Sequence, residues 1–217
     1  MSRAAARRCL HTLAVLGYVD GGSGGYRLAP KVLSLGYAYL HTASVPRVAQ
    51  PVLERLAERL HESCSLTVLD GDEIVYVARA ATRRILSVGL SVGSRLPAYC
   101  TSMGRVLLAF CGDAEISAYL ARVKPVRHTR HTIVDRTTLR AELARVRAAG
   151  YALVDQELEI GLRSLAVPVR RLDQSVVAAM NVGVQATRVD RGTMVREYLP
   201  VLRAAAEEIG FAIGHLR

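Results

Sequence analysis

Four side chains of this 217-residue sequence have the chemistry of a nucleophilic centre: Cys100, His128, His131 and Asp155. Cys100 precedes a predicted helix whose start would lower the pKa of the thiol, with a histidine as base and Asp155 as its orienting group. However, nothing in the spacing brings these residues together, and no nucleophile motif surrounds Cys100. The two histidines with Asp135 could hold a metal, but histidine pairs without a third clear ligand are usually solvated. We therefore expect no enzymatic activity, metal or cofactor.

A second chemistry, the binding of a small carboxylate, is suggested by Arg95–Ala109 (RLPAYCTSMGRVLLA). This segment reads as an extended stretch that enters a helix capped by Thr101 or Ser102. The free N–H groups and partial positive charge of a helix start suit a carboxylate. Gly104 would keep the first turn open to close approach, and Arg105 could add a bidentate cation. The alternative is an ordinary strand-to-helix turn that binds nothing.

Three motifs in order resemble those of the IclR family of bacterial transcription regulators, in its branch that controls aromatic-acid catabolism. They are Leu69–Arg79 (LDGDEIVYVAR), Leu96–Ala109 (LPAYCTSMGRVLLA) and Val154–Pro168 (VDQELEIGLRSLAVP). The resemblance implies a winged helix-turn-helix followed by a GAF-like effector domain, with the ligand between the sheet and the signature helix. It also implies a homodimer or a dimer of dimers (a homotetramer). The implied partners are operator DNA and a small aromatic or dicarboxylic acid, such as protocatechuate, 4-hydroxybenzoate or β-ketoadipate.

Matching the family's pocket by position gives a set of candidate effector-binding residues. They are Tyr99, Thr101, Ser102, Met103, Gly104, Arg105, Val154, Glu157, Arg163, Ser164, Asn181 and Gly183. Val154 departs from a commonly acidic or Ser position, and Ser164 from a commonly Cys position. Loss of the acid suits an anionic ligand, because a buried carboxylate would repel it. Candidate carboxylate clamps are Arg79, Arg83, Arg105 and Arg163, and the alternative for each is plain surface charge.

The N-terminal segment combines a basic helix with a short hairpin. We predict a helix from Ser2 to Leu16, with Ser2 as N-cap and a buried apolar stripe, followed by a glycine-tipped hairpin to Leu28. This order is typical of the second half of a winged helix-turn-helix, whose helix enters the DNA major groove. The candidate DNA-binding residues are Ser2, Arg3, Arg7, Arg8, His11 and Arg27, and the alternative is a solvated arginine face. The family carries two further helices before this one, so a metabolite-binding module without DNA binding is a second hypothesis.

The composition agrees with a nucleic-acid partner. The net charge is +10 and the pI is about 9.9, which favours polyanions, although arginines spread along the whole chain also fit a high-GC genome. Hydrophobic residues make up 51% of the chain, but no apolar run approaches the roughly 20 residues of a membrane span. The start lacks a signal-peptide core. We therefore expect a cytoplasmic protein without a membrane partner, whose four cysteines are free thiols.

The pattern of periodicities predicts an α+β fold with a central antiparallel or mixed sheet flanked by helices. We divide the chain into a partial winged helix-turn-helix at 1–29, a linker helix at 30–44 and an effector domain at 45–217. Within the last, we expect a hairpin over 65–80, a strand over 85–92, the signature helix over 101–111, a helix capped by Asp113, and one capped by Asp135. Three strands over 152–184 and a helix over 193–210 complete the prediction.

Overall fold

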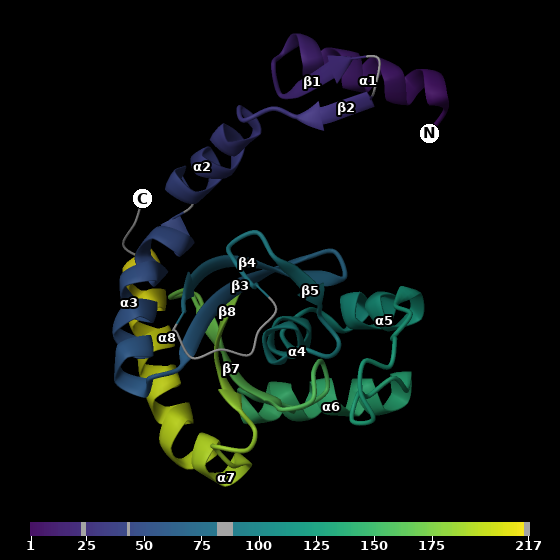
Figure 1. Cartoon of the computed structure of the whole chain (residues 1–217). Helices are drawn as coiled ribbons and strands as arrows, with labels where there is room; N and C mark the ends of the chain where they lie inside the picture. The colour runs from purple at the N-terminus through teal and green to yellow at the C-terminus, as the bar shows by residue number, and fades with distance from the viewer. Residues whose placement is uncertain (23–24, 43, 82–88, 215–217) are drawn as a thin grey trace. The chain divides into compact units, whose positions relative to one another are not determined.

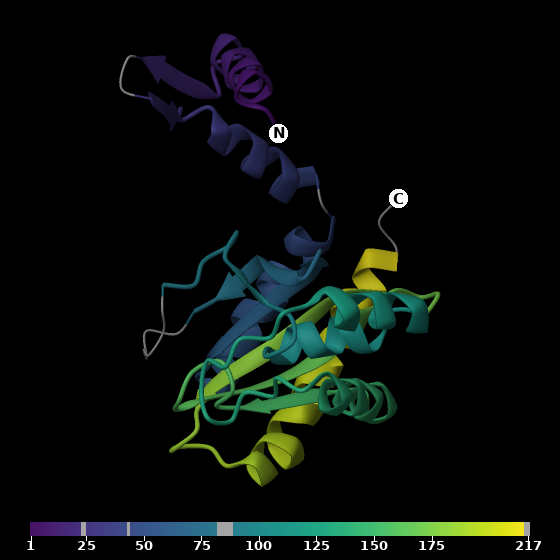
Figure 2. The same ribbon diagram turned by 90° about the vertical axis from the view of Figure 1, so that its right-hand side faces the viewer.

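The computed structural model describes residues 1–22, 25–42, 44–81 and 89–214 (Figures 1 and 2). Contacts between residues divide the chain into two compact units, Met1–Ser44 and Val45–Arg217, and we treat each by itself. Within the described ranges, no helix combines the length and apolar character that a membrane crossing requires.

The smaller unit contains two helices and a hairpin, as the sequence predicts. Helix α1 (Arg3–Val15) is followed by strands β1 (Val19–Gly22) and β2 (Gly25–Leu28) and by helix α2 (Val32–Thr42). The Ser2 hydroxyl caps α1 by accepting a hydrogen bond from the Ala5 N–H at 3.2 Å. Gly17 follows the helix end with φ +75°, a left-handed conformation that favours glycine.

The apolar stripe of α1 is not buried, which contradicts our prediction. No residue of the helix is buried, and Leu13 and Leu16 are 39% and 50% exposed. The buried hydrophobic side chains of this unit, among those described, are Val19 and Ala29. A two-stranded hairpin is too small to cover a 13-residue helix, so the stripe stays exposed in this chain.

The larger unit is built on a six-stranded antiparallel sheet, which decides between the antiparallel and mixed alternatives. Its strand order is β5-β4-β3-β8-β7-β6, and both views show it strongly curled. The bounds are β3 Ser63–Asp70, β4 Glu73–Ala80, β5 Arg95–Pro97, β6 Ala152–Asp155, β7 Leu162–Arg170 and β8 Val176–Gln185. The chain therefore places β3 next to β8, far from it in sequence.

Helices cover both faces of this sheet. Helices α3 (Ser44–Leu60) and α8 (Leu199–Gly214) pack on one face around a core that includes Leu66 and Met180, and Arg55 and Glu208 join them at 2.5 Å. Helix α4 (Ser102–Ala109) packs on the other face, with α5 (Asp113–Arg122) and α6 (Arg136–Ala149) beyond it. The central strands of the sheet are largely buried between these two apolar cores, and the second core holds the start of α4 over the sheet.

Three predicted details differ from the structure. Helix α5 is capped by Gly112, whose N–H donates to the Glu115 carboxylate, and Asp113 is its first helical residue. Of the strand expected over 85–92, residues 85–88 lie outside the described part, and 89–92 form no strand. The last helix is interrupted, because α7 (Arg191–Thr193) continues through a π-helical turn at Met194–Tyr198 into α8. Asp135 does cap α6, as predicted.

Candidate ligand-binding site

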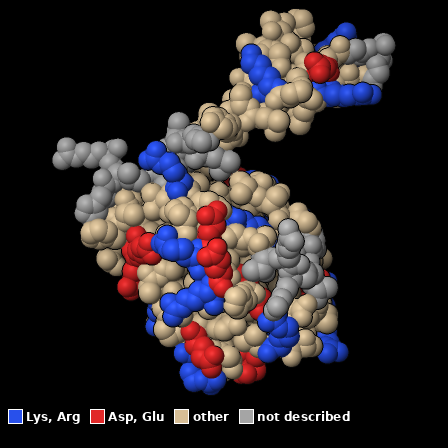
Figure 3. Space-filling view, turned by 60° about the vertical axis from the view of Figure 1, so that its left-hand side comes forward, with Lys and Arg blue, Asp and Glu red and all other residues tan. Residues whose placement is uncertain are grey.

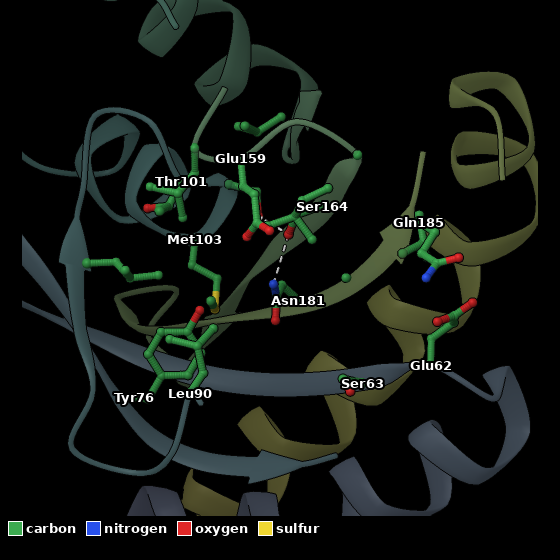
Figure 4. A pocket seen from close by; sticks show the side chains of 18 of the residues that line it. Glu62, Ser63, Tyr76, Leu90, Thr101, Met103, Glu159, Ser164, Asn181 and Gln185 are labelled. Atoms are coloured by element: carbon green, nitrogen blue, oxygen red, sulfur yellow. Dashed lines mark hydrogen bonds between the residues drawn. The ribbon is translucent and has the colours of Figure 1, made fainter. Parts of the chain in front are cut away.

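A cavity of about 520 Å³ lies between the start of α4 and the sheet (Figure 4). Strands β3, β4, β7 and β8 supply its floor, and the segment from Leu158 to Leu162 supplies a further wall. Apolar side chains that line it include Tyr76, Leu90 and Met103. Its size and largely apolar walls are typical of sites for small organic ligands.

The start of α4 is held in place by a backbone turn that depends on glycine. Thr101 is the N-cap: its hydroxyl accepts from the Gly104 N–H at 3.3 Å and donates to the Pro97 carbonyl at 3.0 Å. A Cβ on Gly104 would lie 2.2 Å from the Ala98 carbonyl oxygen. Gly104 therefore permits close packing of the helix on its own approach segment, and we correct our interpretation that it opens the turn to a ligand.

A row of polar side chains joins α4 to the sheet inside the cavity. The hydroxyl oxygens of Ser102 and Ser164 lie 2.7 Å apart, and the Asn181 Nδ2 donates to Ser164 at 2.8 Å (Figure 4). The Asn181 Oδ1 is buried and has no hydrogen-bond partner in the described structure. These three residues come from α4, β7 and β8, so tertiary folding alone brings them together.

The structure separates the twelve candidate effector-binding residues into two groups. Seven of them line the cavity: Thr101, Ser102, Met103, Val154, Ser164, Asn181 and Gly183. The other five do not line it: Tyr99, Gly104, Arg105, Glu157 and Arg163. The hydroxyl of Tyr99 instead exchanges hydrogen bonds with the Val126 backbone and holds the loop before α6.

Arg105 is a structural residue rather than a carboxylate clamp open to the cavity. It is 1% exposed, and its Nη2 lies 2.6 Å from the Glu157 carboxylate. Its Nη1 lies 3.6 Å from Glu142, and its Nε donates to the Tyr99 carbonyl at 2.9 Å. Glu157 also accepts from the Ile133 N–H at 3.0 Å. All of these contacts are internal, so the pair joins α4, α6 and two loops.

Arg163 is also occupied by internal partners. Its Nε and Nη2 each donate to the Asp155 carboxylate at 3.0 Å, the two-pronged geometry typical of arginine. Its Nη1 donates to the carbonyls of Ala186 and Val189. The guanidinium therefore ties β6 and β7 to the segment before α7, outside the cavity.

Arg79 is the clamp candidate that does line the cavity, whereas Arg83 lies outside the described residues. A register shift between Leu66 and Thr67 pairs Ser65 with Arg79 but Thr67 with Tyr76. Because Ser65 and Thr67 share a face of β3, the shift places Tyr76 and Arg79 on that same face although they are three residues apart. Sequence alternation alone could not find this, and our site list omitted Tyr76.

The burial of Cys100 does not support a role for this thiol as a nucleophile. Burial raises the pKa of this thiol to about 11, where a low pKa would be needed. The His128 ring stacks on Tyr99, with 6.2 Å between ring centroids, and His131 accepts a hydrogen bond from Arg130. Among the described residues, no three His, Cys, Asp or Glu side chains are grouped as metal ligands.

Comparison with known proteins identifies a family and several similar regulators. Residues 37–211 match the bacterial transcriptional regulator IclR C-terminal family. The chain is 49% identical over 208 residues to the Pca regulon regulatory protein of Pseudomonas putida, covering 95% of this chain and 72% of that protein. A solved structure from Rhodococcus sp. RHA1 is 46% identical with a TM-score of 0.85, covering 100% of this chain and 87% of that one.

A further solved structure is that of a double mutant of the PobR transcription factor inducer-binding domain from Acinetobacter, in complex with 3-hydroxybenzoic acid. It is 34% identical with a TM-score of 0.72, and the match covers 76% of this chain and 97% of that one. The matched family covers most of this chain, and the relatives extend over nearly all of it. The chain therefore belongs to the IclR family of bacterial transcriptional regulators.

Proposed function

We propose that this chain regulates a catabolic operon by binding operator DNA and a small aromatic acid, and that the cavity under α4 is the effector site. The observation that carries the proposal is the cavity itself, in which Ser102, Ser164 and Asn181 form a polar row beside apolar side chains such as Leu90 and Met103. A few convergent polar groups within an apolar pocket orient a ring that carries polar substituents. The hydroxybenzoic acid bound by the PobR domain supports the same class of ligand here.

A dicarboxylic acid such as β-ketoadipate is the second candidate for the effector. The lining of the cavity favours an aromatic acid over a dicarboxylic acid, because Tyr76, Met103 and Val154 present apolar and polarisable surface that can contact a ring. An aliphatic diacid would leave much of that surface without a partner. We therefore rank protocatechuate and the hydroxybenzoates ahead of the diacid.

For DNA binding we propose the domain division 1–29, 30–44 and 45–217, with α1 as recognition helix and β1–β2 as wing. Arg3, Arg7, Arg8 and His11 are exposed on α1, and Arg27 is exposed on β2. The smaller unit holds five basic residues, these four arginines and Lys31, against the single acid Asp20. Figure 3 shows basic side chains on this unit, as a phosphate-binding surface requires.

We propose that the effector acts by favouring one arrangement of a homodimer or dimer of dimers in the cytoplasm. Such a shift would change the spacing of two recognition helices relative to their half-sites. The effect requires a difference in effector affinity between the two arrangements.

Two measurements test the proposal. In a thermal-shift panel, protocatechuate, 3-hydroxybenzoate or 4-hydroxybenzoate should raise the melting temperature in a concentration-dependent manner, because a ligand that binds only the native state stabilises it. β-Ketoadipate and pyruvate serve as comparison ligands. In fluorescence anisotropy, DNA from upstream of the regulated operon should bind more tightly than scrambled DNA. Effector binding without DNA binding would favour a metabolite-binding module. If the protein bound neither an effector nor DNA, the proposal would be overturned.

A further inference from the structure

We infer that the cavity holds its ligand by both ends, with Arg79 binding the carboxylate and Asn181 accepting a hydrogen bond from a ring hydroxyl. This inference rests on the proposed function, because it takes an aromatic acid as the ligand. It makes Arg79 and Asn181 the residues that determine which acids bind.

Arg79 and Asn181 lie on either side of Ser65, on the three neighbouring strands β4, β3 and β8. Ser65 on β3 pairs with Arg79 on β4 and with Asn181 on β8. Paired residues point to the same face, and neighbouring strands lie about 4.8 Å apart, so the backbones of Arg79 and Asn181 are roughly 10 Å apart. Both side chains line the cavity. We therefore place the ring of the ligand between these two groups.

The Arg79 guanidinium has one edge with a hydrogen-bond partner and one edge without a partner among the described residues. Its Nη1 donates to the Ser65 hydroxyl at 2.9 Å. Its Nε is buried without a hydrogen-bond partner in the described structure. Nε and Nη2 form the edge that matches the two oxygens of a carboxylate. A buried, unsatisfied donor is costly, and an incoming carboxylate would satisfy it.

Three other arginines in the described part of this region already have acidic partners. Arg105 and Arg163 form their ion pairs with Glu157 and Asp155 outside the cavity. Arg188 lines the cavity but pairs with Glu62 at 3.0 Å. Among the described ion pairs, none involves Arg79, which leaves its charge available for a ligand.

Asn181 supplies the opposite chemistry at the other end. The Asn181 Nδ2 donates a hydrogen bond to the Ser164 hydroxyl. The Asn181 Oδ1 is buried and has no hydrogen-bond partner among the described residues. Figure 4 shows the oxygen on the side of the amide that faces away from Ser164. An amide oxygen accepts hydrogen bonds only, so a ring hydroxyl suits it and a second carboxylate does not. This end therefore selects a hydroxybenzoate over a dicarboxylate.

The test is calorimetric titration of wild type, Arg79→Met, Arg79→Lys and Asn181→Leu. The ligands are 4-hydroxybenzoate, benzoate and the uncharged amide 4-hydroxybenzamide. Arg79→Met should weaken binding of both acids by about 10- to 150-fold, as expected for a charged hydrogen bond, and leave the amide within about threefold. Arg79→Lys should recover part of the loss. Asn181→Leu should weaken the hydroxybenzoate by about 3- to 10-fold and leave benzoate unchanged.

Several outcomes would overturn the inference while the proposed function stands. One is that Arg79→Met binds the acids with wild-type affinity. Another is that Arg79→Met loses affinity for the acids and for the amide equally. A third is that Arg188→Met, and not Arg79→Met, loses affinity for the acids. Arg196→Met, a change at an exposed arginine paired with Glu197, controls for net charge. If wild type binds none of the acids, the proposed function fails and the inference fails with it. Urea unfolding of each variant verifies the fold.

Discussion

The Arg105 guanidinium and the Glu157 carboxylate lie 2.6 Å apart, and both side chains are almost completely buried. Glu157 precedes β7, and Arg105 lies in the first turns of α4, so the pair fixes the helix that carries Ser102. A buried charge that loses its partner carries a large desolvation cost. The pair therefore stabilises the start of α4 at the cavity, although neither residue lines the cavity.

Removing one partner of this pair should strongly destabilise the protein. We expect Arg105→Met to lower the free energy of unfolding by about 3–5 kcal/mol, because Glu157 would remain buried and unpaired. Urea denaturation followed by circular dichroism measures this. As a matched control, Arg122→Met removes a half-exposed pair with Asp72 and should cost at most about 1 kcal/mol. Equal stabilities of the two variants would contradict the structural role of Arg105.

Gly104 should not tolerate even a methyl group. In Gly104→Ala the new Cβ would meet the Ala98 carbonyl oxygen at 2.2 Å, a backbone atom that cannot move aside freely. We expect a loss of about 1–3 kcal/mol in the free energy of unfolding, as in other overpacked sites. Gly36→Ala is the control, since no described atom outside its chain neighbours and its own helix backbone lies within 4 Å of the added Cβ. If Gly104→Ala melts like wild type, α4 does not pack on its approach segment as described.

The rate at which each cysteine is alkylated should decrease with the burial of its thiol. Burial raises the pKa values of Cys64 and Cys100 to about 12 and 11, whereas Cys9 is exposed. At pH 8 a thiol of pKa 11 is ionised in about one molecule in a thousand, so iodoacetamide should label Cys9 first. Mass spectrometry of the labelled peptides checks the order. Rapid labelling of native Cys100 at pH 8 would contradict its burial.

The same pKa shifts predict instability in alkali. A folded-state pKa above the ordinary value means that the native protein retains the proton more tightly than the unfolded chain does. The resulting stabilisation is complete below about pH 9 and is lost as the pH rises through the folded values of Cys100 and Cys64. The urea midpoint should therefore be lower at pH 10.5 than at pH 8. Cys100→Ala should reduce this difference, and an unchanged difference would assign it to other groups.

DNA binding should depend on the exposed arginines of α1. We expect Arg7→Ala to weaken operator binding and to reduce the slope of log affinity against log salt by about one, as for one lost phosphate contact. A loss confined to one DNA sequence would instead indicate a base contact. Arg196→Met, in the larger unit, should leave both quantities unchanged. An unaltered affinity in Arg7→Ala would remove that residue from the interface.

Local signals predicted most helices and strands, because caps and turns are encoded by neighbouring residues. Ser2 and Asp135 cap the helices that we expected them to cap. The site was only partly predictable. Ser102, Ser164 and Asn181 meet through the pairing of β7 with β8 and the packing of α4, which no spacing reveals. Resemblance to the family supplied these positions.

The charged residues were the hardest to assign from sequence. Arg105 and Arg163 read as ligand clamps because arginine favours carboxylates, but each forms its pair with a carboxylate of the protein itself. Which arginine keeps an open edge depends on partners distant in sequence and on the register shift that turns Arg79 toward the cavity. Such partners become visible only once the fold is known.

Calorimetric titration of wild type, Ser102→Ala and Ser102→Phe with 3-hydroxybenzoate, 4-hydroxybenzoate and protocatechuate tests whether the cavity under α4 is the effector site. Ser102 is 2% exposed and faces the cavity from the start of α4, so a phenyl ring there would occupy the ligand's volume. We predict saturable binding of at least one acid to wild type, weaker binding to Ser102→Ala, and none to Ser102→Phe with its fold retained by circular dichroism. Wild-type binding by Ser102→Phe would contradict the placement of the effector site under α4.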